Sequence, residues 1–178
     1  MLEYMPNGTV EDYMKSHHGQ ISMARCLRWI AEAAEALHLL HSMGIIHCDL
    51  GPHNLLLDAD MSLKIADFSG SSIDGSRAMV CPGTRYTAPD PHWKPGKPPT
   101  VEEDLFSLGS TAYYIVMGKA PFDKLPDEEV ERKYLNGEFP DLAGVPCGQI
   151  IEMCWLQEAH SAQLVRELVD KVSVEEGL

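Results

Sequence analysis

Asp49, Asn54 and Asp67 are the residues of this chain whose types and spacing best fit a chemical task. Asn54 follows Asp49 by five residues, and Asp67 follows it by eighteen. Three oxygen-bearing side chains at fixed separations suit the binding of Mg²⁺ on a nucleotide while a hydroxyl group attacks. Magnesium takes one or two carboxylates and leaves its other positions to phosphate oxygens and water. The spacing therefore predicts a site for metal-assisted phosphoryl transfer.

Each of these residues also has a simpler structural explanation. Asp49 could hydrogen-bond its own backbone in a turn, Asn54 could cap the start of a strand, and Asp67 could be an ordinary loop carboxylate. The apolar runs Leu55–Leu57 and Leu63–Ile65 flank a polar turn and predict a short β-hairpin. That hairpin would hold Asn54 and Asp67 in fixed positions, which favours the metal-binding interpretation.

Helical periodicity covers much of the remaining chain. Residues 22–42 have apolar side chains at three- and four-residue steps, and Gly44 lies past their end. Thr100 and Glu103 form a capping-box pattern that begins a second helix, which Gly118 ends. Three more helices are predicted at residues 127–135, 149–155 and 161–172. The fold class is therefore mainly α, and the helix after Thr100 should be buried because it is apolar nearly all round.

The order of several short motifs resembles the large, C-terminal lobe of the eukaryotic protein-kinase family. The motifs are Leu2-Glu3-Tyr4-Met5-Pro6-Asn7-Gly8-Thr9, His47-Cys48-Asp49-Leu50-Gly51-Pro52-His53-Asn54, Asp67-Phe68-Ser69-Gly70 and Gly83-Thr84-Arg85-Tyr86-Thr87-Ala88-Pro89-Asp90. The resemblance implies one kinase-like domain at 1–178, with the hinge between lobes at 1–8, the large lobe at 9–178 and the activation segment at 67–90. It implies a helical bundle whose small β-hairpin carries the catalytic and metal loops.

The same resemblance implies a role for each site residue. Asp49 and Asn54 would be catalytic, with Asp49 accepting the proton of the substrate hydroxyl. Asn54 and Asp67 would bind the metal. The residues that would bind ATP are Glu3, Met5, Leu56 and Asp67. The implied cofactors are ATP and Mg²⁺, and the implied partner is a protein substrate. We expect serine or threonine as the acceptor because these are the more common acceptors in the family.

Three other residues have family counterparts with structural roles. His47 and Phe68 resemble members of a stacked apolar column, and Asp104 resembles a helix carboxylate that hydrogen-bonds the catalytic-loop backbone. The helix dipole alone would also favour an acid at this helix start. The motif at 83–90 is closest to tyrosine-kinase and tyrosine-kinase-like sequences, as is Cys154-Trp155. This similarity concerns lineage and not the acceptor.

The chain departs from the family pattern at several positions. Cys48 replaces an Arg that usually pairs with a phosphorylated activation loop, so loop phosphorylation should not be the main switch. Gly51 replaces a Lys or Arg that neutralises charge on the transferred phosphate, and a missing stabiliser of this kind can cost about 3–4 kcal/mol. Ser69 replaces a Gly and reduces backbone freedom, which Gly70 could partly restore.

A further departure concerns the anchor of the activation segment. The family joins a Glu to an Arg, whereas this chain has Asp90 at the first position and Ala162 near the second. Arg166, one helical turn further on, could substitute for the missing Arg.

The family's Gly-rich loop, phosphate-binding Lys and helix Glu precede the hinge, and this sequence contains none of them. We therefore expect the chain alone to bind ATP weakly or not at all and to be catalytically inactive, so whether it is an enzyme by itself is left open. The first hypothesis is the large lobe of an active protein kinase. The alternative is a pseudokinase or truncated kinase fragment that acts as a non-catalytic interaction module. A chance match by an unrelated helical domain is disfavoured by the ordered run of motifs.

Composition excludes several other functions. The net charge of −13 argues against binding to nucleic acid or an anionic membrane. The most apolar stretch, 111–117, is too short to span a bilayer, and no signal-peptide pattern is present. The five cysteines include no CxxC pair, which favours reduced thiols in an intracellular, cytoplasmic setting. His38 and His41 have a spacing that could ligate zinc, but without a third ligand a half-exposed helix face is the better explanation. The oligomeric state is not indicated.

Overall fold

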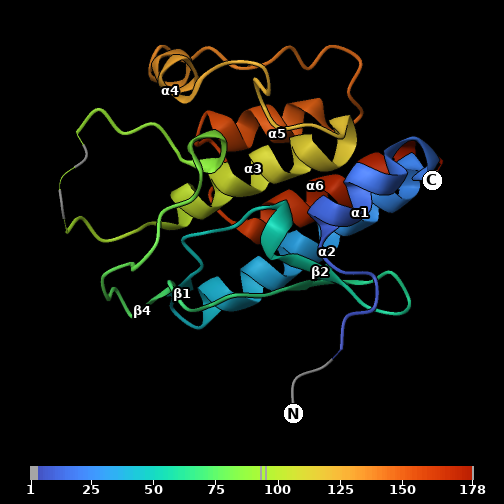
Figure 1. Cartoon of the computed structure of the whole chain (residues 1–178), viewed down its shortest axis with the longest axis horizontal. Coiled ribbons are helices and arrows are strands. Elements are labelled where there is room, and N and C mark those ends of the chain that lie inside the picture. Colours follow the sequence, from blue (N-terminus) through green and yellow to red (C-terminus); the bar gives the residue numbers. More distant parts are fainter. Residues whose placement is uncertain (1–3, 93, 95, 178) are drawn as a thin grey trace.

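The computed structural model describes residues 4–92, 94 and 96–177, and this part of the chain is mainly helical, as predicted. The helices are α1 (Val10–His17), α2 (Met23–Ser42), α3 (Val101–Met117), α4 (Asp127–Leu135), α5 (Gly148–Trp155) and α6 (Ala162–Glu175). The strands are β1 (Ile45–Ile46), β2 (Leu55–Leu57), β3 (Leu63–Ile65) and β4 (Ser72–Ile73). Figure 1 shows α3 running through the middle of the molecule, with α4 above it and the strands below.

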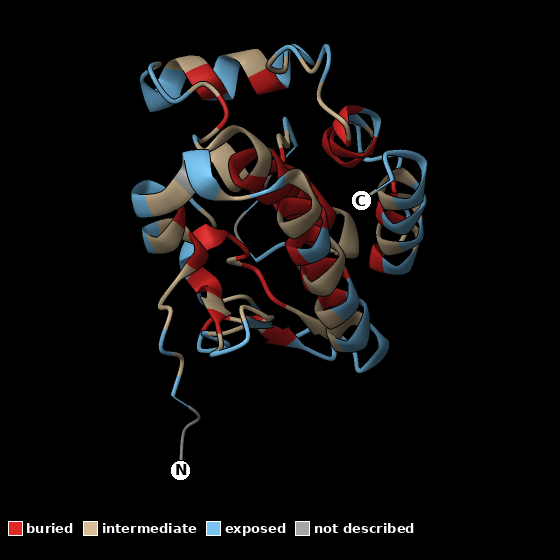
Figure 2. Ribbon diagram, turned by 90° about the vertical axis from the view of Figure 1, so that its right-hand side faces the viewer, coloured by how far each residue is buried: buried red, intermediate tan, exposed pale blue. Residues whose placement is uncertain are grey.

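Helix α3 forms the centre of the core. Its residues are buried without a break from Asp104 to Ile115, and Figure 2 shows the buried residues gathered in the interior of the molecule. The Thr100 hydroxyl accepts a hydrogen bond from Glu103 N–H, while the Glu103 carboxylate accepts one from Thr100 N–H. Gly118 ends the helix with a left-handed φ of 69°. Both predicted ends and the predicted burial of this helix are confirmed.

Neighbouring helices hold α3 firmly. Helices α2 and α5 pack on it directly, and α6 packs along α2. Phe106 lies edge-on to Tyr134 at 5.4 Å between ring centroids, and Phe139 stacks on Trp155 at 5.2 Å. Aromatic pairs of this kind contribute about 0.5–1.5 kcal/mol each beyond their buried area. The Trp155 indole N–H also donates to Ser110 Oγ of α3 at 2.9 Å.

Two small antiparallel sheets lie beside the helices. β2 pairs with β3, with Leu55 opposite Ile65, which confirms the predicted hairpin. Leu55 and Leu57 are buried, whereas Leu56 points to the other face of the strand and is half-buried. β1 pairs with β4 in the second sheet. None of the described helices combines the length and the apolar character that crossing a bilayer requires.

Residues 7–9 run along β2 and fasten the start of the described chain to the hairpin. Leu57 N–H donates to the Gly8 carbonyl at 2.9 Å, and a β-bridge joins Thr9 to Leu56. Residues 4 and 5 have no strand partner among the described residues.

Part of the segment at 69–85 packs into the fold. β4 lies inside this segment, and Gly70 and Ser72 are buried. A Cβ atom on Gly70 would lie 2.1 Å from a methyl group of Val80. Close packing therefore requires this glycine, and its φ is not left-handed. The sequence could not reveal β4, because a strand of two residues has no measurable alternation.

Candidate active site

Two loops meet at one end of the β2–β3 hairpin. The Asn54 carbonyl accepts a hydrogen bond from Ala66 N–H at 2.9 Å, and His47 Nε2–H donates to the Ala66 carbonyl at 3.0 Å. The His47 ring lies edge-on to the Phe68 ring at 5.4 Å between centroids, which confirms the predicted contact between these two residues. The loop at 47–54 and the loop at 66–70 are thus tied together at the positions that flank the predicted site residues.

Asn54 is bonded to the loop that carries Asp49. Its Nδ2 donates to the Asp49 backbone carbonyl at 2.8 Å and to Asp49 Oδ2 at 3.2 Å. Asp49 N–H in turn donates to His47 Nδ1 at 3.3 Å. No described residue donates to the side-chain oxygen of Asn54 or to Asp49 Oδ1. Two oxygen atoms of these buried or half-buried side chains are therefore left available to other groups.

Asp67 is exposed and locally ordered by Ser69. The Ser69 hydroxyl donates to Asp67 Oδ1 at 2.7 Å, and the Ser69 N–H donates to the same oxygen at 3.3 Å. These bonds lower the pKa of the Asp67 carboxyl below its ordinary value, so the group is ionised at neutral pH. Asp67 has a left-handed φ of 60°, which is uncommon for a non-glycine residue and typical of functional sites.

Two of the residues predicted to bind adenine are described, and Glu3 lies outside the described residues. Met5 and Leu56 are both half-buried. Gly8 N–H closes a turn onto the Met5 carbonyl at 3.2 Å, and Asn7 N–H donates to the Leu57 carbonyl at 3.4 Å. The turn that begins at Met5 is therefore fastened to the strand that carries Leu56.

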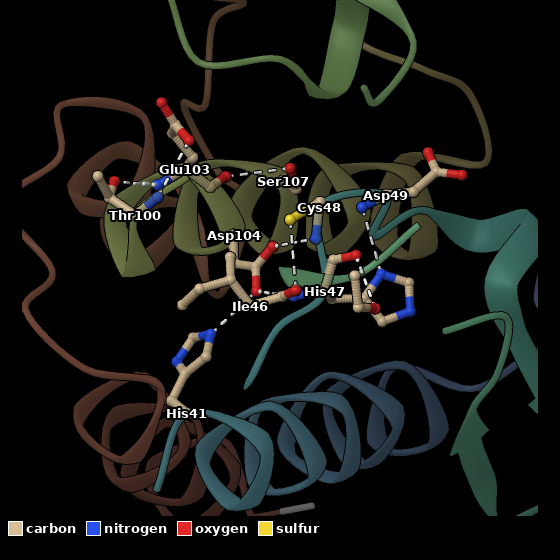
Figure 3. Close-up of polar contacts among 10 residues, drawn as sticks. His41, Ile46, His47, Cys48, Asp49, Thr100, Glu103, Asp104 and Ser107 are labelled. Carbon is tan, nitrogen blue, oxygen red and sulfur yellow. Dashed lines mark hydrogen bonds and ion pairs between the residues drawn. The ribbon is translucent and has the colours of Figure 1, made fainter. Parts of the chain in front are cut away.

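Asp104, in the first turn of α3, holds the backbone of the 47–54 loop (Figure 3). Its Oδ2 accepts hydrogen bonds from His47 N–H at 2.7 Å and from His41 Nε2–H at 2.9 Å, and its Oδ1 accepts one from Cys48 N–H at 2.9 Å. The side chain is 1% exposed, so these three donors compensate a carboxylate that has lost its water. The predicted contact between Asp104 and the loop backbone is confirmed.

Cys48 is an uncharged residue in the lining of a cavity beneath the 67–90 segment. Its thiol donates to the Ile46 carbonyl at 3.3 Å, and burial raises the pKa of this thiol to about 11, so it stays neutral at physiological pH. A cavity of about 250 Å³, whose lining includes Cys48, Val80 and Pro82, lies between the loop and the segment. The Cys48 backbone has a left-handed φ of 68°, and the bond from its N–H to Asp104 helps to hold that conformation.

The end of the 67–90 segment is fastened to α3 and α4. Ser107, one turn after Asp104, donates through its hydroxyl to the Tyr86 carbonyl at 2.6 Å. Arg85 forms an ion pair with Asp127 at 2.6 Å and donates to two carbonyl groups in the connection between α3 and α4. The Tyr134 hydroxyl donates to the Arg85 carbonyl at 3.2 Å. Helix α3 therefore positions both the 47–54 loop and the segment end.

Asp90 has a partner that the sequence did not indicate. Lys97 Nζ lies 2.6 Å from Asp90 Oδ2 and 3.3 Å from Glu103 Oε1. The bond to Lys97 lowers the pKa of Asp90, and the same bond raises the pKa of Lys97. The prediction that Arg166 replaces the missing Arg is wrong, because Arg166 pairs with Glu35 at 3.0 Å where α6 packs on α2.

The structure corrects the interpretation of His41. Its side chain is 9% exposed and bonds Asp104, so it does not lie on a half-exposed helix face, whereas His38 is exposed. Among the described residues, no three His, Cys, Asp or Glu side chains come together as a metal site. Sequence reasoning missed the role of His41 because the contact joins residues 63 positions apart. Its place in the last turn of α2, just before the 47–54 loop, was the available signal.

Residues 1–173 match the family model described as "Protein kinase domain". The chain belongs to the protein kinase family. A protein of Acanthamoeba polyphaga mimivirus, named as a serine/threonine-protein kinase/receptor, is 30% identical in an alignment 180 residues long, which covers 97% of this chain and 11% of that protein. An Aurora kinase of Patiria pectinifera is 35% identical in an alignment 142 residues long, which covers 78% of this chain and 34% of that kinase. The chain therefore spans about a tenth of the first relative and about a third of the second.

Protein kinases generally use ATP and Mg²⁺, and the side-chain oxygen atoms of Asn54 and Asp67 fit such a cation. Asp67 offers an ionised carboxylate whose Oδ2 has no partner among the described residues. Asn54 offers an amide oxygen, because its nitrogen is the atom bonded to Asp49. One carboxylate and one neutral oxygen are a common protein contribution to Mg²⁺, with phosphates and water supplying the rest.

Proposed function

We propose that this kinase domain transfers the γ-phosphoryl group of ATP to a protein hydroxyl, with serine or threonine as the acceptor. The observation that carries the proposal is the pairing of the two loops through Ala66 and His47, which brings Asp49, Asn54 and Asp67 to one end of the hairpin. The names of the two relatives support a kinase, and the name of the viral protein supports the serine/threonine acceptor.

Three side chains would take part directly in phosphoryl transfer. Asn54 Oδ1 and Asp67 Oδ2 would hold Mg²⁺, which when bound neutralises phosphate charge and orients the phosphates. Asp49 Oδ1 would accept the proton of the acceptor hydroxyl while the oxygen of that hydroxyl bonds to the γ-phosphorus and the bond to ADP breaks. Residues 1–8 would be the hinge, with Glu3, Met5 and Leu56 against adenine. The large lobe would span 9–178, and the activation segment would be 67–90.

The proposal is tested by measuring Mg·ATP binding and phosphoryl transfer with the same protein. A ligand at about 100 times its Kd adds about 2.7 kcal/mol of stability, which corresponds to roughly 5–10 °C in melting temperature for a chain of this size. Because the sequence predicts weak ATP binding by the chain alone, the assays compare it with a version extended upstream of residue 1. We expect Mg·ATP to raise the melting temperature of the extended version and ATP with EDTA to raise it much less. The extended version should also transfer phosphate from labelled ATP to a mixed protein substrate such as casein. Neither binding nor transfer by the extended version would overturn the proposal.

The non-catalytic alternative has one observation in its favour. The 47–54 loop contains no Lys or Arg, so no strong cation of this loop faces the transferred phosphate. An interaction module of this kind would bind partners without turnover. Binding of Mg·ATP without any phosphoryl transfer would favour this alternative, whereas transfer that requires Asp49 would exclude it.

The uncharged side chain of Cys48 leads to a separate prediction about regulation. Because the Cys48 thiol is neutral and buried, it cannot pair with a phosphate on the 67–90 segment. Treatment of the extended version with a protein phosphatase should therefore change its transfer rate by less than about twofold, with mass spectrometry confirming that phosphate was removed. A large loss of activity after treatment would contradict the prediction.

A further inference from the structure

Gly51 and His53 lie against each other beside Asp49. Gly51 is buried and extended, with φ −170° and ψ 168°, a conformation that any residue can adopt. A Cβ atom on Gly51 would nevertheless lie 2.6 Å from His53 Cε1 and 2.8 Å from His53 Nδ1. The His53 ring thus covers the space that a side chain at residue 51 would need.

The other end of the His53 ring reaches the Asp49 carboxylate. His53 Nε2 lies 3.6 Å from Asp49 Oδ2, and Asn54 Nδ2 lies 3.2 Å from the same oxygen. Two nitrogen atoms therefore face Oδ2, while no described residue donates to Oδ1. When one oxygen of a carboxylate is held in place, the other oxygen points in a fixed direction. A proton acceptor requires such a fixed orientation.

We infer that His53 is a positioning residue for Asp49: it helps to hold Oδ2 so that Oδ1 faces the acceptor hydroxyl. The inference rests on the proposed function. It also links the two unusual residues of the loop, because only the absence of a side chain at Gly51 lets the His53 ring lie there.

The size of the effect follows from exposure. The side chains of His53 and Asp49 are 43% and 25% exposed, so water screens their interaction. Loss of the contact should therefore lower kcat by about three- to fivefold, the upper range for a partly exposed pair. The KM for ATP should stay unchanged, because His53 contacts Asp49 and not the residues proposed to bind the nucleotide.

The kinetic test is a double-mutant cycle in the extended version used to test the proposed function. His53→Ala and Gly51→Ala should each lower kcat by about three- to fivefold, the second because its methyl group displaces the His53 ring. The double variant should be no worse than either single variant, since both remove the same contact. His53→Gln keeps an N–H donor and should recover part of the rate, and His160→Ala, at another exposed histidine, is the matched control. The inference would be overturned if the loss of kcat in the double variant equals the product of the two single losses, or if His53→Ala leaves kcat unchanged.

A second measurement does not depend on activity. At fixed pH, long-range ¹H–¹⁵N correlation spectra report which ring nitrogen of a histidine carries the proton. We expect His53 to hold it mainly on Nε2, toward Asp49, and expect Asp49→Ala and Gly51→Ala to reduce that preference while the His160 ring stays unchanged. If the proton distribution between the two His53 ring nitrogens is the same in both variants as in the wild type, the inference is overturned. If the wild type transfers no phosphate, the proposed function fails, and these spectra alone decide whether His53 holds Asp49.

Discussion

Replacement of Asp104 with alanine is expected to lower the melting temperature by about 6–12 °C. The carboxylate accepts hydrogen bonds from the buried N–H groups of His47 and Cys48 and from the His41 ring. A buried donor without a partner costs about 1–3 kcal/mol, so the two backbone groups alone account for about 3 kcal/mol. At this chain length each kcal/mol corresponds to about 2–4 °C. Differential scanning calorimetry measures the shift.

Two further variants make the Asp104 result specific. Asp104→Asn keeps one acceptor oxygen and should lose roughly half as much stability. Glu128→Ala removes an exposed acid from the first turn of α4, as Asp104→Ala does in α3, and should melt within about 2 °C of the wild type. In the Asp104→Ala background, His41→Ala should cost little more, because its partner is already gone. Equal melting of Asp104→Ala and Glu128→Ala would contradict the argument.

Asp49→Asn is expected to reduce phosphoryl transfer by about 10²–10⁴-fold, the usual range for a positioned general base. Asparagine matches aspartate in shape but cannot accept the proton of the acceptor hydroxyl. The bond from Asn54 to the residue 49 carbonyl, 2.8 Å in the wild type, uses the backbone and is retained. The melting temperature and the affinity for Mg·ATP should therefore stay close to those of the wild type. Single-turnover transfer from labelled ATP by the extended version measures the loss.

The controls separate proton transfer from metal binding. Asp67→Asn removes the carboxylate proposed to hold Mg²⁺ and should abolish both the Mg²⁺-dependent stabilisation and the transfer. Asp60→Asn changes an exposed acid in the hairpin turn and should leave both intact. Full activity of Asp49→Asn would show that another group accepts the proton and would exclude the role proposed for Asp49.

Local signals made most of the fold predictable from the sequence. The capping box of Thr100 and Glu103 marks the start of α3, and Gly118 marks its end. Each of these signals involves only a few neighbouring residues. The predicted helix at 127–135 coincides with α4. The alternating burial of Leu55, Leu56 and Leu57 follows from strand geometry alone. Each of these features depends on neighbours in sequence, which is why periodicity and capping rules captured them.

Contacts that depend on three-dimensional packing were less predictable. Asp90 pairs with Lys97 rather than Arg166 because the packing of α6 on α2 takes Arg166 to Glu35. His41 reaches Asp104 across 63 positions. The sequence showed that Gly51 lacks a cation, but not that the His53 ring covers it. In each case the partner is set by how whole helices and loops pack, which no local pattern encodes.

The way in which Asp104 holds its loop has a consequence for sequence divergence. The carboxylate recognises main-chain N–H groups at positions 47 and 48 and ignores the side chains attached to them. Nineteen of the twenty amino acids supply that group, and proline alone does not. A substitution at position 48 can thus remove the charged side chain that the family usually has there without releasing the loop, so the backbone of the candidate site does not depend on that residue type.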